Sequence, residues 1–94
     1  MSQPTRKVGP PRSHILETEI DEEISLYDPR NEQVVVLNQT ASDVWRLSDG
    51  ECDLEEIVRL LSVAYGVAAE DIRGEVEDTV RSLQGQGLLE MEQD

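Results

Sequence analysis

The chain has few of the residues that carry most enzyme chemistry. Its 94 residues include one Cys, one His, no Phe and only three aromatic side chains. A lone cysteine excludes an internal disulfide, and a zinc site of ordinary composition would need further Cys or His ligands. No apolar run approaches the roughly 20 residues that a membrane-spanning helix needs. The N-terminus also lacks the apolar stretch of a signal peptide. These absences predict a reduced, cytoplasmic setting.

Positive charge is scarce as well. The chain carries 8 cations against 21 carboxylates, for a net charge of −13. The charge is uneven, because residues 1–13 carry +3 and residues 14–94 carry −16. Proteins that bind phosphates gain affinity through Lys and Arg. We therefore expect neither a nucleic-acid partner nor adhesion to an anionic membrane.

A change of composition divides the chain near residue 13. Residues 1–13 hold three of the four prolines and almost no apolar side chains. Such a segment buries too little surface to offset the entropy of ordering. The sequence therefore predicts a flexible basic arm over 1–13 and a single domain over 14–91. The charge of the arm suggests docking to a partner enzyme.

The first part of the domain has the period of β-strands. Apolar and polar residues alternate over 16–20 and again over 24–27, which predicts two strands with one wet face. Asp21-Glu22 forms the short connection between them, and Asp28–Asn31 has the residues of a turn. A third strand over Gln33–Leu37 is apolar on both faces. One of its faces, or its open edge, is therefore left for a partner.

The rest of the chain has the period of α-helices. We expect a first helix capped by Asn38 or Thr40 and ended near Gly50. A second helix begins at the cap Asp53 and ends at Gly66. The third helix begins near Glu70 and ends at Gly85 or Gly87, with one apolar stripe of Ile72, Val76, Val80 and Leu83. Leu88-Leu89 is expected to pack back on the core. The predicted fold class is α+β, with a three-stranded antiparallel sheet followed by three helices.

Candidate catalytic residues are few and poorly placed. His14 is the only histidine, and nothing around it in the sequence suggests a nucleophile held in reach. Cys52 lies between Glu51 and Asp53, whose charges oppose thiolate formation. The six glycines stand singly, without a phosphate-binding loop. We therefore predict a non-catalytic protein with no cofactor and no metal.

Binding remains, and two binding modes fit this order of elements. Three helices with a small sheet are typical of a winged helix-turn-helix, which usually reads DNA. The third helix, however, carries five carboxylates against two arginines, so DNA would be repelled. Alternatively, a peptide can add itself to the open edge of the third strand. A DNA-binding regulator and an acidic structural subunit stay open as alternatives.

Several short segments together carry a resemblance to a known family. They are Ile24–Pro29, Val36–Ala41, Val44-Trp45 and Asp49-Gly50 in the first half, and Leu54–Ile57, Leu83 and Gly87–Leu89 in the second. In this order and spacing the chain resembles the PqqD family over about residues 14–90. Ala68-Ala69 departs from the family pattern, which often has Pro near the start of the third helix.

The resemblance implies a fold, a function and a site. PqqD-like proteins have a winged-helix-like fold and are peptide-recognition elements in the biosynthesis of ribosomally made, post-translationally modified peptides. They bind the leader of a precursor peptide as an added strand between the third strand and the third helix. Carried over to this chain, the peptide-binding residues are Val34, Val35, Val36, Arg73, Val76, Glu77 and Val80. The opposite flank of the third helix, with Glu75, Asp78 and Ser82, is the open alternative.

The resemblance also implies partners. Besides the leader peptide, the expected partner is a modifying enzyme, which carries the catalysis. In lasso-peptide systems this is a leader peptidase, and in the quinone-cofactor system it is a radical enzyme. The sequence does not favour one pathway over the other.

Overall fold

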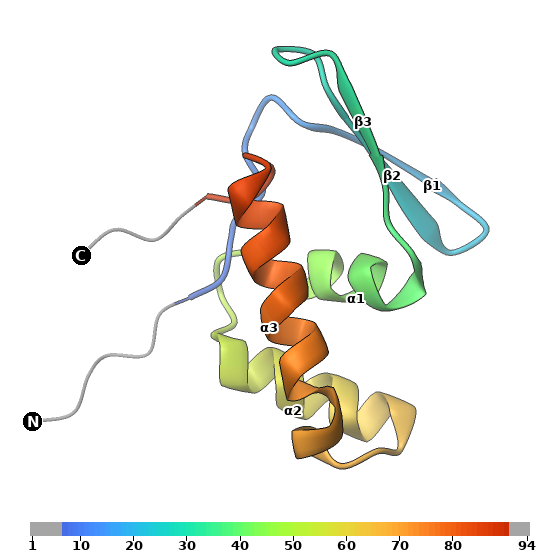
Figure 1. Cartoon of the computed structure of the whole chain (residues 1–94), viewed down its shortest axis with the longest axis vertical. Coiled ribbons are helices and arrows are strands. Elements are labelled where there is room, and N and C mark those ends of the chain that lie inside the picture. The colour runs from blue at the N-terminus through green and yellow to red at the C-terminus, as the bar shows by residue number, and fades with distance from the viewer. Residues whose placement is uncertain (1–6, 91–94) are drawn as a thin grey trace, which may run out of the picture.

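The structure is a computed structural model, and it describes residues 7–90. Three strands come first: β1 (Leu16–Ile20), β2 (Glu23–Asp28) and β3 (Gln33–Val36). They form one antiparallel sheet in the order β1-β2-β3, so β1 and β3 are its two edges. Three helices follow and lie on one side of the sheet (Figure 1). The predicted α+β class and the order of elements are confirmed.

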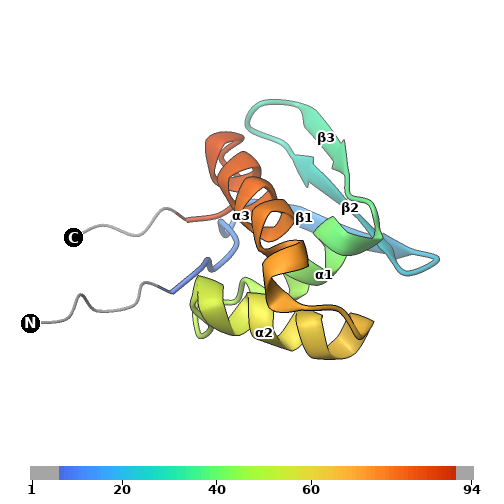
Figure 2. The same cartoon turned by 60° about the horizontal axis from the view of Figure 1, so that its bottom comes forward.

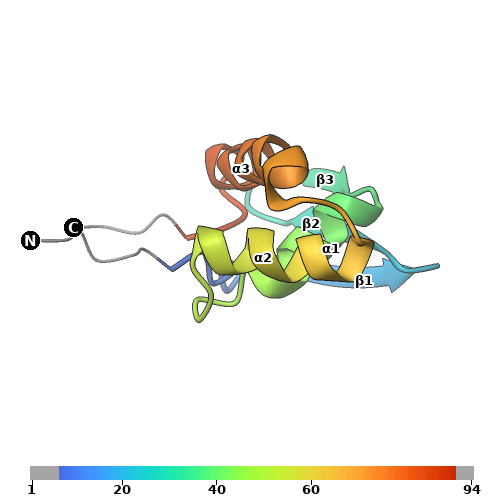
Figure 3. The same ribbon diagram turned by 90° about the horizontal axis from the view of Figure 1, so that it is seen from below.

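The helices begin where local hydrogen bonds favour them. Asn38, rather than Thr40, caps α1 (Gln39–Leu47), and its side chain accepts from the backbone N–H of Ala41 at 2.8 Å. Asp53 and Glu56 form a reciprocal capping box at the start of α2 (Leu54–Tyr65). The third helix, α3 (Ala69–Gly85), has no side-chain cap, as its two alanines imply. It packs directly on α1 and α2 and lies over α2 in Figure 3.

One hydrophobic core joins the sheet to all three helices. Ile24 and Leu26 of β2 are fully buried beneath the helices. The expected return of Leu88-Leu89 to the core is confirmed, since both are fully buried. The remaining buried apolar residues are Val8, Leu37, Val44, Trp45, Ile57, Val58, Leu61, Val76, Val80 and Leu83. Within the described residues, no helix is long and apolar enough to cross a membrane.

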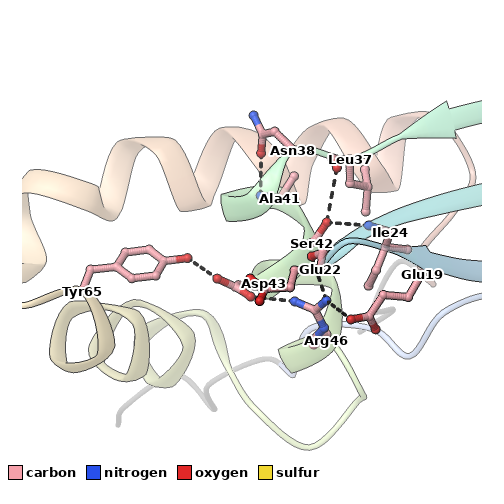
Figure 4. Close-up of polar contacts among 10 residues, drawn as sticks. All are labelled: Glu19, Glu22, Ile24, Leu37, Asn38, Ala41, Ser42, Asp43, Arg46 and Tyr65. Atoms are coloured by element: carbon pink, nitrogen blue, oxygen red, sulfur yellow. Dashed lines mark hydrogen bonds and ion pairs between the residues drawn. The ribbon is translucent and has the colours of Figure 1, made fainter.

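The polar residues of β1, and not its apolar residues, face the helices, which is the reverse of the usual alternation. Cross-strand partners share a face, and Glu17 and Glu19 lie opposite the buried Leu26 and Ile24. The acidic residues of β1 therefore face the helices. They have partners there, because Trp45 Nε1 donates to Glu17 at 2.8 Å. Arg46 pairs with Glu19 at 3.1 Å (Figure 4). The apolar residues of β1 consequently face outward.

Part of the predicted flexible arm is packed on the body of the domain. We call Lys7–Ser13 the strap. Val8 is buried in the core, its N–H donates to Cys52 O at 2.8 Å and its carbonyl accepts from Gly50. Further along, Glu90 N–H donates to Pro10 O at 2.9 Å. The structure thus differs from the expectation over 7–13, because one apolar anchor and several backbone bonds offset the ordering entropy. The expectation for 1–6 lies outside the described residues.

Candidate functional site: a groove between β3 and α3

The free edge of β3 offers backbone groups to another strand. Leu37 N–H donates to Ile24 O at 2.8 Å, so the main-chain groups of Leu37 point toward β2. Orientation alternates along an antiparallel strand. The main-chain groups of Val35 therefore also face β2, whereas those of Val34 and Val36 face away from the sheet. Two N–H and two C=O groups on this edge are thus directed toward an incoming strand.

A buried serine sets the end of this edge. Ser42 Oγ accepts from Ile24 N–H at 2.9 Å and donates to Leu37 O at 3.3 Å, so it stands between β2 and the chain leaving β3 (Figure 4). The bond that Ile24 N–H would otherwise donate to Leu37 O is thereby replaced by two bonds through the hydroxyl group, whereas Leu37 N–H still donates directly to Ile24 O. The chain then turns into α1 at Asn38, which closes the sheet edge after Leu37.

A groove lies beside this edge, lined by residues of β3 and α3. Figure 2 shows how these two elements face each other. The volume of the groove is about 320 Å³. Its apolar part comes from both walls and from α1, and includes Val35, Leu37, Ala41 and Leu83. Its polar part follows α3 and the end of β3, with Asn38, Asp78, Thr79, Ser82 and Gln86. An extended peptide at the β3 edge would direct every second side chain into this groove.

A hydrogen bond spans the groove at one end. Gln33 Nε2 at the start of β3 donates to Gln86 Oε1 after α3, at 3.1 Å. Gln86 in turn donates to Ser82 Oγ at 3.0 Å, which fixes its amide group on the helix. The groove is therefore bridged near Gln33 and continues toward the start of α1.

The structure separates the predicted site residues into two groups. Val34, Val35 and Val36 lie on the β3 edge as expected, with Val35 directed into the groove. The four α3 residues do not line the groove. Arg73 forms an ion pair with Glu55 of α2, and Val76 is fully buried. Glu77 and Val80 line the opposite side of α3, with Leu54, Arg81 and Gln84.

The flank of α3 that faces β3 carries Asp78, Thr79 and Ser82, and Gln86 continues it just after the helix. The sequence left this flank open as the alternative. Val76 and Val80 indicate which stripe of α3 is buried, but not which of the two flanks of that stripe faces the sheet. Ala41 of α1 was not considered as a site residue. The only sequence feature that points to Ala41 is its small side chain in the first helical turn after β3.

Two polar clusters lie outside the groove. Asp28, at the end of β2, accepts from Asn31 Nδ2 at 2.8 Å and lies 3.2 Å from His14 Nε2. Burial alone would raise the pKa of Asp28, but hydrogen bonds from Asn31 and Arg30 hold it below its usual range. At the other end, Tyr65 donates to Asp43 (Figure 4). Burial, helped by this carboxylate, raises the pKa of Tyr65 to about 12.

The outward face of the sheet is apolar and open. Leu16, Tyr27 and Val34 are cross-strand partners in one row, and Val36 follows in the next row. Leu16 is 57% exposed, Val34 62% and Val36 69%. Ile20, at 62%, extends the surface along β1. We call these five residues the outer sheet face. Several exposed apolar side chains on one face of a sheet are typical of an interaction site.

A comparison with protein families decides the family membership. The profile described as "Coenzyme PQQ synthesis protein D (PqqD)" matches residues 23–89. The chain belongs to the PqqD family. The match includes β2, β3, all three helices and therefore both walls of the groove. No curated protein matches the chain closely.

Two solved structures resemble this PqqD-family chain. One is TbiB1 in complex with the TbiA(beta) leader peptide, with a TM-score of 0.78 and 25% identity, covering 94% of this chain and 99% of that one. The other is lasso peptide synthetase B1 complexed with the leader peptide, with a TM-score of 0.74 and 28% identity, covering 87% of this chain and 96% of that one. Both relatives hold a leader peptide.

Proposed function

We propose that this PqqD-family protein binds the leader of a ribosomal precursor peptide as a fourth strand on β3. The observation that carries the proposal is the free β3 edge beside the groove. Main-chain bonds from Val34 and Val36 would supply affinity, and the groove would select alternate side chains. The two leader-bound relatives support this function and favour a lasso-peptide pathway over the quinone pathway.

The protein itself would be non-catalytic, and a modifying enzyme would act on the bound precursor. Holding the leader raises the local concentration of the precursor core at that enzyme. A leader peptidase is the expected enzyme in a lasso-peptide pathway, and a radical enzyme in the quinone pathway. Because ribosomal precursors are made in the cytoplasm, the complex would form there.

The outer sheet face is the proposed docking surface for this enzyme. A leader strand on β3 would add its own outward side chains next to Val34 and Val36, since alternate residues of neighbouring strands share a face. The enzyme would then contact the protein and the leader on one continuous surface. Apolar residues that point away from the core, as in β1, are explained by such a partner.

Calorimetric titration with the leader of the neighbouring encoded precursor tests the first part. Val36→Pro removes an N–H that points away from β2, so the edge loses one bond while the ladder to β2 stays intact. We expect this change to weaken leader binding about tenfold, the effect of one lost interstrand hydrogen bond. Unchanged affinity in a folded Val36→Pro variant would exclude strand addition to β3.

A matched pair on α3 tests which flank lines the site. Ser82→Phe fills the groove, whereas Gln84→Phe places the same side chain on the opposite side of the helix. Leader binding should be lost in the first variant and kept in the second. The reverse result would return the site to the flank of Arg73 and Glu77.

Enzyme docking is tested by Leu16→Asp with Val63→Asp as its control. Both side chains are exposed, at 57% and 76%, but Leu16 lies on β1 and Val63 on α2. Leu16→Asp should abolish binding of the modifying enzyme in a pull-down and leave calorimetric leader binding within about twofold, because β2 and β3 separate β1 from the added strand. Equal enzyme binding by the two variants would remove the outer sheet face from the proposal.

DNA binding is not favoured. The helix α3 carries five carboxylates against two arginines, Arg73 and Arg81, so its surface would repel the phosphates of DNA.

A further inference from the structure

The groove combines an apolar floor with a carboxylate at its rim. Val35, Leu37 and Leu83 supply apolar surface, and Asp78 stands on the α3 side of the same groove. Asp78 is the only charged residue among those that line the groove in the described part of the chain. A long cationic side chain matches this arrangement, because Lys and Arg lay an apolar stem on apolar surface and extend the charge beyond it.

We propose that Asp78 selects a Lys or Arg in the leader, at one fixed position of the added strand. This inference rests on the proposed function and deepens it, since it specifies the chemistry of the peptide. It assigns Asp78 as a specificity-determining residue that contacts the ligand directly.

The position of the cation follows from the sheet geometry. The leader residue beside Val35 has its side chain on the groove side, because neighbours across a ladder share a face. The Gln33–Gln86 bond spans the end of the groove near the start of β3. The cationic side chain therefore enters toward the Leu37 end, where the groove extends to Asn38 and Ala41.

The present partner of Asp78 is easily replaced. Arg81 Nη1 lies 3.0 Å from Asp78 Oδ1, but the two side chains are 74% and 77% exposed. A pair this exposed contributes little to stability. The leader cation can therefore take the place of Arg81 at small cost, and the net charge of −13 attracts a cationic segment from a distance.

Selection from a phage-displayed library of random 12-residue peptides tests the proposal on the whole protein. We expect the selected peptides to share Lys or Arg at a fixed distance from an apolar residue. Failure to select any peptide that competes at the groove, as judged by Ser82→Phe, would count against the proposed function itself. Groove-binding peptides without a positioned Lys or Arg would overturn only the role of Asp78.

Direct binding separates Asp78 from general charge attraction. With one selected peptide, Asp78→Asn should weaken binding roughly two- to fivefold, the range of exposed ion pairs. Glu77→Gln removes the same charge on the opposite side of α3 and should change binding little. The effect of Asp78→Asn should shrink at high salt. Equal losses in both variants would show that only net charge matters, and would overturn the proposal.

Reversing the charge of residue 78 predicts a change in the selected peptides that a misfolded variant would not produce. Selection on Asp78→Lys should replace Lys or Arg by Asp or Glu at the same peptide position. A persistent preference for Lys or Arg in this variant would exclude contact between Asp78 and the leader cation.

Discussion

At the scale of the residue, Asp28 connects three parts of the chain. Its carboxylate accepts from the backbone N–H groups of Arg30 and Asn31, from the Asn31 side chain, and faces His14 before β1. These contacts stabilise the turn that connects β2 to β3. A buried carboxylate is held ionised here because every contact stabilises its charged form.

The lowered pKa of Asp28 predicts a pH-dependent stability. Its folded pKa lies below the ordinary 3.8, so its contribution is present above that value and is lost as pH falls through the folded pKa. Asp28→Asn should therefore be less stable than wild type near neutral pH, with a difference that shrinks in acid. Urea unfolding from about pH 7 to about pH 3 measures this. The exposed Glu51→Gln variant should show no such convergence, and a constant Asp28→Asn difference at all pH values would contradict the prediction.

At the scale of the element, the β1–β2 hairpin carries local strain. Its connection is Asp21-Glu22, and both residues have positive φ, 51° and 72°. Two-residue hairpins require this backbone form and favour Asn-Gly, because side chains with a Cβ fit it poorly. Strand pairing and the contacts between β1 and α1 therefore stabilise the hairpin, and they outweigh the unfavourable backbone conformation of Asp21 and Glu22.

Glu22→Gly is predicted to stabilise the protein by about 0.5–1 kcal/mol, since glycine adopts positive φ without steric cost. The contact that Arg46 makes at this position is kept, because it uses the backbone carbonyl of Glu22. Thermal unfolding measures the change. Asp21→Gly should give a smaller gain, because Asp tolerates this conformation better. Destabilisation by Glu22→Gly would mean that its side chain contributes more than the turn costs.

Elements were predictable where one local signal dominates. The cap Asp53 and Gly66 indicated the two ends of α2, and the three consecutive valines indicated β3. The facing of β1 was not predictable, because Glu17 and Glu19 are drawn inward by Trp45 and Arg46, which are distant in sequence. The flank of α3 that lines the groove was not predictable for a related reason, since Val76 and Val80 are compatible with either flank facing the sheet. The order of the strap was not predictable from its proline-rich composition, because it depends on the burial of a single residue, Val8.

At the scale of the whole molecule, the strap closes the fold. It runs past the loop before α2 and then along the chain after α3, where Arg12 N–H donates to Leu88 O at 3.0 Å. Gly9 permits the close approach, because a Cβ there would lie 2.1 Å from Ser48 O. The strap thus links the end of α3, which is one wall of the groove, to the loop between α1 and α2.

A pair of shortened chains tests the strap. A chain that begins at Lys7 keeps Val8 and its backbone bonds, whereas one that begins at His14 loses them. We expect the second chain to be less stable by at least about 2 kcal/mol, from lost apolar burial and hydrogen bonds. Urea unfolding of the two measures this difference. Equal stability would restore the view of 7–13 as a dispensable arm.

The pairing of the strap with the chain after α3 has a consequence for protein engineering. Because Pro10 bonds to Glu90, the two ends of the described chain run side by side, on the side of α3 away from the β1–β2 hairpin (Figure 1). A fluorescent protein or an affinity handle could therefore be joined at either end without covering the groove, and a short linker between the ends would give a circular permutant opened at the β1–β2 turn.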